Sequence, residues 1–194
     1  MANPALRAKL SPQEYLDFER SSEQRHEYAD GEIFAMAGGT LEHSAVAANL
    51  LGELRNALLG RGCRMLTSDM RIKTANGRYV YPDGAVLCER PEFEDDKRDT
   101  LLNPAVIVEV LSDSSEAYDR GEKFAQYRTL PSLRDYVLAS QKEPRLEVFT
   151  RQSDGSWVLR IYGPGERAAL TSIGVEITMD RTYADVFEQS AAGA

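Results

Sequence analysis

The sequence predicts an α/β (α+β) protein with a central mixed β-sheet flanked by helices, an N-terminal helix and hairpin, and a β-rich C-terminal end. Three observations predict it. One long segment carries apolar residues at helical spacing, one run is apolar enough for a strand buried on both faces, and the last part of the chain alternates short apolar runs with turn residues. With 194 residues, 42% of them hydrophobic, we expect one domain over 1–194. Its core would span about 12–187, with tails at 1–10 and 190–194.

The first third of the chain predicts two helices and a hairpin. Ser11, a proline at 12 and a glutamate at 14 form a helix-starting pattern, so a short helix should run to about Arg20. Two half-apolar runs within 26–37 flank Asp30-Gly31, a dipeptide suited to a β-turn. A longer helix is expected from Leu41 to Leu59, because one apolar stripe follows its turns. This stripe consists of Val46, Leu50, Leu54 and Leu58.

The remaining two thirds predict mostly strands. Two of them, 63–74 and 79–88, are joined by a turn at Ala75-Asn76-Gly77. The run 105–111 is apolar apart from Glu109, so it should lie at the centre of the sheet. The segment Ser112 to Ser115, with side chains that cap helices, then precedes a helix that carries Lys123 and ends near Pro131. Three further strands are expected at 135–140, 145–151 and 157–162.

Charge and composition restrict the possible partners. The formal net charge is −8, and this excess opposes non-specific binding to a phosphate backbone. One segment differs, since 55–78 carries six basic residues against the single acid Asp69. It either faces phosphates or is an ordinary solvated surface. No stretch approaches the roughly 18 apolar residues of a membrane span, and the N-terminus lacks an apolar core.

Two cysteines, Cys63 and Cys88, lie in apolar stretches without a neighbouring cysteine or histidine at metal-ligand spacing. We therefore expect reduced core cysteines in a cytoplasmic protein with no membrane contact.

Two acidic residues suggest chemistry. Asp83 follows a proline in one predicted strand, and Glu109 lies 26 residues later in the buried one. If the strands are neighbours, the carboxylates meet, and paired carboxylates are ligands that Mg²⁺ accepts together with water and phosphate oxygens. The backbone carbonyl of Val110 is a further candidate ligand. The structural alternatives are a turn residue at Asp83 and a buried ion pair at Glu109, because an unpaired buried carboxylate is costly.

The motifs around these acids resemble a known family. Tyr81-Pro82-Asp83, the run Val108 to Ser112, Asp119 to Lys123 with Tyr127, the hairpin Glu27 to Glu32 and His43 together resemble the Uma family of restriction endonucleases, within the PD-(D/E)xK nuclease superfamily. The resemblance covers about residues 12–187. It implies a restriction-endonuclease-like core and Mg²⁺-dependent hydrolysis of phosphodiester bonds, usually in DNA.

The chain departs from the superfamily pattern at one position. The residue two after Glu109 should be lysine and is Leu111. The resemblance implies that the catalytic lysine has moved to the following helix, where Lys123 matches it. Without the resemblance, a lysine on a helix is more often a solvated residue.

Four further residues are candidates for supporting roles. Glu27 matches the family as an extra acid, although it also fits a cross-strand partner of an arginine; Glu32 and Glu53 are its rivals. His43, at the start of the long helix, would bond a phosphate or cap a turn. Tyr127 is interpreted as core packing.

The sequence thus predicts an endonuclease that cuts DNA with Mg²⁺, for which Mn²⁺ substitutes, at Asp83, Glu109 and Lys123. The alternative is a catalytically inactive nuclease-fold module that binds DNA or a protein, and Leu111 is the evidence for it. A phosphohydrolase of small nucleotides is disfavoured because no glycine-rich phosphate loop occurs. A homodimer joined through the end from Arg145 onward would place two equal sites on the two DNA strands.

Overall fold

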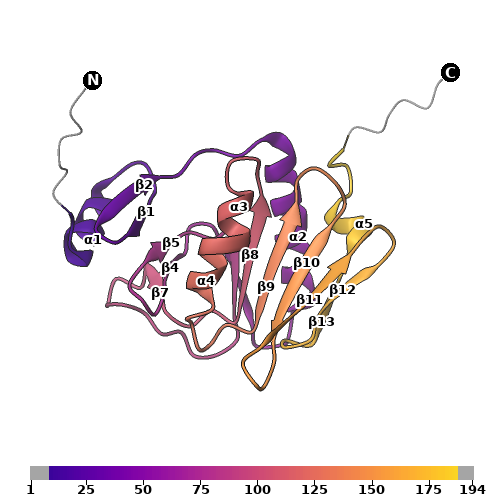
Figure 1. Ribbon diagram of the computed structural model, residues 1–194. Helices are drawn as coiled ribbons and strands as arrows, with labels where there is room; N and C mark the ends of the chain where they lie inside the picture. The colour runs from indigo at the N-terminus through magenta and orange to yellow at the C-terminus, as the bar shows by residue number, and fades with distance from the viewer. Residues whose placement is uncertain (1–8, 188–194) are drawn as a thin grey trace.

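The computed structural model describes residues 9–187, and its centre is a six-stranded mixed sheet (Figure 1). The predicted apolar run forms an inner strand that is buried over its whole length. It is parallel to β9 and antiparallel to β6, so the prediction of a central mixed sheet is confirmed. In spatial order the strands are β11 (Trp157–Tyr162), β10 (Leu146–Arg151), β9 (Asp135–Ser140), β8 (Val106–Leu111), β6 (Gly84–Leu87) and β3 (Arg64–Thr67).

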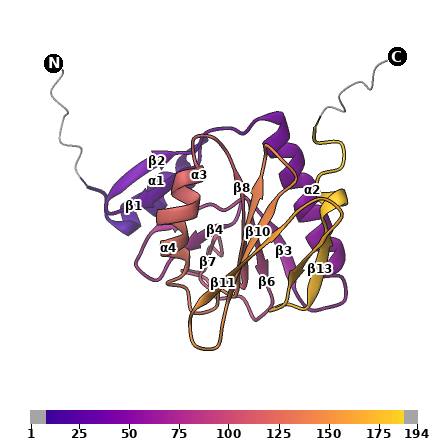
Figure 2. The same ribbon diagram turned by 45° about the vertical axis from the view of Figure 1, so that its right-hand side comes forward.

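Helices cover both faces of this sheet (Figures 1 and 2). On one face lies the predicted long helix, whose apolar stripe is buried against the sheet. The β12–β13 hairpin and a short helix pack on the same side. The other face carries one interrupted helix. These elements are α2 (Leu41–Ala57), β12 (Arg167–Leu170), β13 (Val175–Thr178), α5 (Met179–Thr182), and then α3 (Glu116–Tyr118), the π-helical turn η1 (Asp119–Lys123) and α4 (Phe124–Tyr127).

The N-terminal elements belong to a second sheet beside the first (Figure 1). The first helix has the predicted capping box between Ser11 and Glu14, and its buried Tyr15 stacks on Tyr28 of the hairpin. The hairpin turns at Asp30-Gly31 as predicted, with positive φ at both residues. The elements are α1 (Pro12–Ser21) and, in spatial order, β2 (Glu32–Ala35), β1 (His26–Ala29), β5 (Tyr79–Val80), β4 (Arg71–Lys73) and β7 (Thr100–Leu101).

Each of the two strands predicted at 63–74 and 79–88 is broken, and its halves lie in different sheets. The second break falls at Pro82-Asp83, because proline has no N–H to continue a ladder. The chain therefore leaves the N-terminal sheet at β5 and enters the six-stranded sheet at β6. The predicted Asn-Gly turn at 76–77 does join β4 to β5. Sequence analysis did not predict β7.

The prediction of reduced cysteines was wrong, because Cys63 and Cys88 form a disulfide. β3 and β6 pair antiparallel with Arg64 opposite Leu87, so one step further along the same register the two cysteines face each other. Their separation of 25 residues gave no sign of this pairing before the register was known.

Within residues 9–187, no helix combines the length and apolar character needed to span a bilayer. The predicted tail at 190–194, and all but two residues of the one at 1–10, lie outside the described residues.

Candidate active site

Asp83 lies where the chain passes between the two sheets, directly before β6. Gly84 pairs with Val108, so the same antiparallel register sets Asp83 opposite Glu109, and opposite residues share one face of a sheet. The Asp83 carboxylate accepts a hydrogen bond from the Val110 backbone N–H at 2.7 Å. The register therefore places the two residues predicted to be catalytic opposite each other on neighbouring segments of the chain.

Gly84, directly after Asp83, allows β6 to pack closely against the side chains of Leu51 and Met65. A Cβ there would lie 2.4 Å from a methyl group of Leu51 on α2 and 2.6 Å from Met65 on β3. A side chain at residue 84 would therefore require the ends of the Leu51 and Met65 side chains to move.

Glu109 is buried and has two hydrogen-bond donors on the same oxygen. The Lys123 ammonium lies 2.8 Å from Oε1, and the Tyr127 hydroxyl donates to Oε1 at 2.9 Å. Glu109 and Leu111 lie two residues apart on β8, so both face the helix layer that carries Lys123. This shared face explains how an amine from the helix reaches the carboxylate while Leu111 packs in the core.

Lys123 is buried, which excludes the alternative of a solvated helix residue. It belongs to the π-helical turn η1, and such turns are frequent at functional sites. Besides Glu109, its ammonium approaches Glu27 at 3.3 Å, Asp119 at 3.7 Å and the Tyr81 carbonyl at 3.5 Å.

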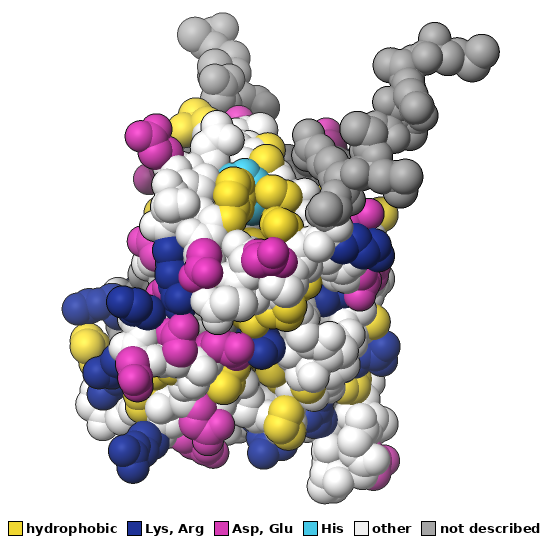
Figure 3. Space-filling model, turned by 90° about the vertical axis from the view of Figure 1, so that its left-hand side faces the viewer, with side chains coloured by type: hydrophobic (Ala, Val, Ile, Leu, Met, Phe, Trp, Pro, Cys, Tyr) yellow, Lys and Arg dark blue, Asp and Glu magenta, His cyan; other side chains and the backbone are white. Residues whose placement is uncertain are grey.

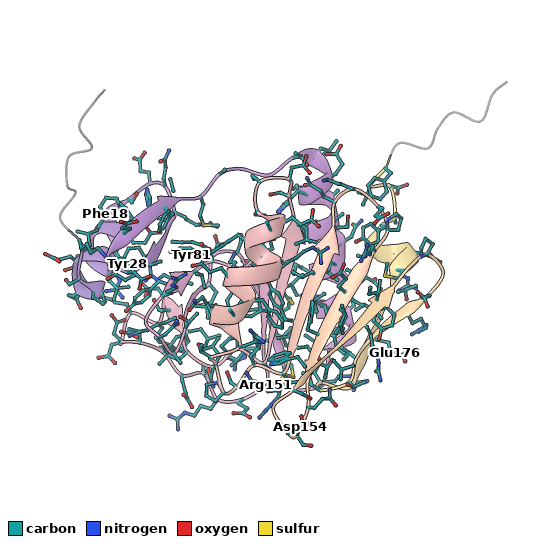
Figure 4. All side chains as sticks on the ribbon, viewed as in Figure 1. Phe18, Tyr28, Tyr81, Arg151, Asp154 and Glu176 are labelled. Atoms are coloured by element: carbon teal, nitrogen blue, oxygen red, sulfur yellow. A yellow bond between two sulfur atoms is a disulfide. The ribbon has the colours of Figure 1, made fainter. Side chains whose placement is uncertain are left out.

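Of the three acids considered as the supporting residue, the structure brings Glu27 to the site. Its carboxylate also accepts the Tyr81 backbone N–H at 3.1 Å, and Figure 4 shows Tyr81 between the N-terminal elements and the helix layer. Glu53 lies on α2, where its carboxylate is 3.7 Å from Arg181. Glu32 is exposed on β2 and lines a hollow beside Glu27.

His43 lies in the first turn of α2 with its ring against Asp83. The Nε2 atom is 3.5 Å from Asp83 Oδ2, and this contact raises the pKa of His43 above its ordinary value. The cap of the helix is Thr40, whose hydroxyl accepts the His43 N–H. The ring is therefore not the cap, which leaves the imidazole free for another role.

Sequence analysis missed two residues of this cluster. Asp119 is buried one turn before Lys123, and Tyr127, interpreted as packing, holds Glu109 through its hydroxyl. The spacing of four residues from Asp119 to Lys123 was an available signal, because such pairs meet on one helix face.

Negative charge exceeds positive charge in this cluster. Burial raises the pKa of Glu109 well above its usual value, and it also raises the pKa of Asp119. Burial alone would lower the pKa of Lys123, but Glu109, Glu27 and Asp119 together raise it. The lysine is therefore held charged, as expected beside carboxylates.

Among residues 9–187, no three His, Cys, Asp or Glu side chains converge into a ready-made metal site. Asp83 and Glu109 form a pair, and a pair is enough for Mg²⁺, which takes only one or two protein carboxylates.

The basic segment 55–78 does not form one phosphate-binding face. Arg71 is buried 3.0 Å from Asp99, Lys73 lies 2.7 Å from Glu94, and Arg78 joins two acids. Part of the predicted positive surface is thus used in ion pairs within the protein.

Residues 12–180 match the Uma2 family, whose description is "Putative restriction endonuclease". Two relatives come from Synechocystis sp. (strain ATCC 27184 / PCC 6803 / Kazusa). "Uncharacterized protein slr1290" is 39% identical over 178 residues, which cover 90% of this chain and 92% of the relative. "Uncharacterized protein sll1609" is 36% identical over 151 residues, covering 77% and 85%.

A crystal structure described as "a putative nuclease belonging to DUF820 from Anabaena variabilis ATCC 29413" superposes with a TM-score of 0.75. The superposition covers 92% of this chain and 99% of that one at 15% identity. At this identity the likeness shows that the two chains share a fold.

Proposed function

The chain belongs to the Uma2 family, and from this premise we propose that it is a metal-dependent endonuclease that hydrolyses phosphodiester bonds of DNA. One observation carries the proposal: Asp83, directly before β6, lies opposite Glu109 of β8 in the antiparallel register, with the Lys123 ammonium 2.8 Å from Glu109.

The residues present fit a magnesium ion. The described partners of Glu109 bind Oε1, and those of Asp83 bind Oδ2, so each carboxylate keeps a second oxygen for a ligand bond. The Val110 N–H points towards Asp83. The N–H and C=O of one strand residue point to the same side, so the Val110 carbonyl is suited to be the third protein ligand. Mn²⁺ would substitute in such an oxygen site.

When bound, the ion polarises the scissile phosphate and acidifies a water. The protein side chains position the reactants. Lys123, kept charged by its three acids, donates a hydrogen bond to the attacking water and offsets the negative charge that develops on the phosphate. Tyr127 holds Glu109 in place. Protonated His43 donates to a phosphate oxygen on the Asp83 side.

The test is cleavage of supercoiled plasmid DNA by the purified protein in Mg²⁺, in Mn²⁺ and in EDTA. We expect nicked or linear products with either cation and none in EDTA. Equal cleavage in EDTA would show a contaminating nuclease. The acidic residue Asp99, which pairs with arginines away from the candidate site, provides a control variant, Asp99→Asn, with unchanged cleavage.

The alternative of an inactive module rests on Leu111. Calorimetric titration with Mn²⁺ separates the two proposals without an activity assay, because a degenerate site binds no cation. Binding that disappears in Asp83→Asn supports the enzyme, and no binding by the parent protein supports the inactive module.

We also propose that two copies associate through the C-terminal end. The edge strand β11 supports this, since Val158, Leu159 and Ile161 are exposed on it, and exposed apolar edges tend to pair. Sedimentation velocity at micromolar concentration tests it. We expect a dimer for the parent and a monomer for Ile161→Lys, while a clean parent monomer removes the proposal.

A further inference from the structure

One face of the β1–β2 hairpin is not used by the protein core. Glu27 pairs with Phe34, and the Met36 N–H bonds the Arg25 carbonyl at 2.9 Å. Opposite and alternate residues share a face of a hairpin, so these four side chains lie together. The other face carries Tyr28, which packs on α1.

This face passes two hollows, one on each side of Glu27. The first has a volume of about 500 Å³ and contains Arg25 and Met36 together with Asp83. The second has a volume of about 590 Å³ and contains Phe34 and Glu27. Glu27 lies 3.3 Å from Lys123, so the hairpin face leads from one hollow past the candidate active site to the other.

The hairpin face and its two hollows have the dimensions of a single nucleic-acid strand and not of a duplex. Each hollow has the size of a small-molecule pocket, roughly 300–1,000 Å³, which holds a nucleotide. Along the hairpin, Arg25 and Ala29 are four residues apart, roughly 13 Å at about 3.3 Å per residue. That length corresponds to a few nucleotides.

The chemistry of the two hollows is alike. The first combines Met36, 38% exposed, with the Arg25 guanidinium, which forms an exposed ion pair with Asp69. The second combines Phe34, 52% exposed, with Arg78, whose guanidinium is held by Asp30 and Glu122. Apolar and aromatic surfaces stack on bases and guanidinium groups bind phosphates. Tyr118 adds a second ring to the second hollow.

Charge also disfavours a duplex. The net charge is −8, and acidic and basic side chains are interspersed over the face shown in Figure 3. A duplex carries one negative charge per roughly 1.7 Å and is bound mainly through phosphates. Affinity on this surface must therefore come from bases, and bases are free to stack only in an unpaired strand.

We propose that the hairpin face and its two hollows bind an unpaired DNA strand, with the scissile phosphate between Glu27 and Asp83. This proposal rests on the proposed function and narrows its substrate to single-stranded DNA or unpaired regions of branched DNA.

The experiment measures fluorescence anisotropy of a labelled 12-nucleotide DNA, single-stranded or as a blunt duplex, with the protein in EDTA and in Ca²⁺. The single strand should bind at least tenfold more tightly than the duplex. Phe34→Ala and Met36→Ala should each weaken its binding about tenfold, Phe34→Trp should retain it, and Leu59→Ala, at an exposed apolar residue outside both hollows, is the matched control. For the guanidinium, Arg25→Ala should weaken binding, whereas Arg167→Ala, which breaks a similar exposed ion pair, should not.

Separate measurements of binding and of cleavage distinguish the proposed strand binding from the proposed hydrolysis. The proposed binding of an unpaired strand by the hairpin is overturned, even if the protein cuts DNA, by either of two results. One is a duplex that binds as tightly as the single strand or more tightly, and the other is an affinity for the single strand that is unchanged in both Phe34→Ala and Met36→Ala. If the single strand binds, the hairpin variants weaken this binding, and no cation gives cleavage, then the proposed binding of an unpaired strand is supported and the proposed hydrolysis is refuted. Thermal melting of each variant confirms that lost binding does not reflect unfolding.

Discussion

Two groups of buried or half-buried charges lie near the junction of the sheets, and they differ in charge balance. In the first group, called here the balanced cluster, Arg20 and Arg71 meet Asp95 and Asp99 at 2.7 to 3.0 Å. In the second, the acidic cluster, three carboxylates lie around one ammonium and a fourth lies opposite one of them in the strand register. These carboxylates belong to Asp83, Glu109, Asp119 and Glu27, and the ammonium to Lys123.

The difference indicates which cluster is structural. Two cations and two anions leave the balanced cluster with no formal charge, so it is complete without a ligand. With all four acids ionised, the acidic cluster has a formal charge of −3, or −2 when His43 is protonated, and burial together with the repulsion between these acids raises the pKa of Glu109 and of Asp119. A divalent cation would neutralise the remaining −2. Under the proposed function, binding of a metal ion would relieve this repulsion.

The largest expected effect separates the clusters by activity. Asp83→Asn and Glu109→Gln should each lower the rate of DNA cleavage by about 1,000-fold or more, because each removes a preorganised charge at the reacting centre. Asp99→Asn should leave the rate unchanged when assayed where the variant is folded. Single-turnover kinetics on plasmid DNA measures all three, and equal losses would show that both clusters act only on stability.

Lys123→Met tests the cation of the acidic cluster. Turnover should fall about 100-fold, since one charged donor is lost, while Mn²⁺ affinity largely survives because the oxygen ligands remain. Removing one partner of a buried ion pair should also lower the free energy of unfolding by about 3 kcal/mol without metal. Urea unfolding and Mn²⁺ calorimetry measure both. An unchanged rate contradicts the assignment of the lysine.

The sequence predicted the elements that depend on local signals. The capping box at Ser11, the stripe of α2 and the buried run at β8 each follow from residues a few positions apart. The breaks at 68–70 and 82–83 were not predicted, because they depend on which sheet each half of a strand joins. That is a long-range choice, and local propensity does not encode it.

For the candidate site the same limit applies. Asp83, Glu109 and Lys123 were found through spaced motifs and the family resemblance. Asp119 was missed although its spacing of four residues from Lys123 was a local signal, and in the structure both residues are buried in the π-helical turn. The roles predicted for these residues stay predictions until the variants are measured.

Metal binding should stabilise the protein through the acidic cluster alone. A cation at 100 times its dissociation constant adds about 2.7 kcal/mol to the free energy of unfolding. We expect Mg²⁺ or Mn²⁺ to raise the melting temperature of the parent and of Asp99→Asn but not of Asp83→Asn. Asp119→Asn, which removes one repulsive charge, should be more stable than the parent without metal and should gain less from it. Scanning calorimetry with the cation and with EDTA measures these melting temperatures. An equal increase in the melting temperature of Asp83→Asn would show that the cation binds elsewhere.

The smallest effect concerns pH and the balanced cluster. Hydrogen bonding to Arg20, with the nearby charge of Arg71, lowers the pKa of Asp99 to about 2, against about 3.9 in an unfolded chain. A carboxylate with a lowered pKa contributes stability that is present above about pH 4 and is lost as the pH falls towards 2. Asp99 is about one-third exposed, so solvent screening keeps this contribution small. Asp99→Asn should therefore be less stable than the parent at pH 6, and the difference should shrink between pH 4 and pH 2. Urea midpoints at several pH values measure it, and a difference that stays constant down to pH 2 would mean that Asp99 contributes by packing and not by its charge.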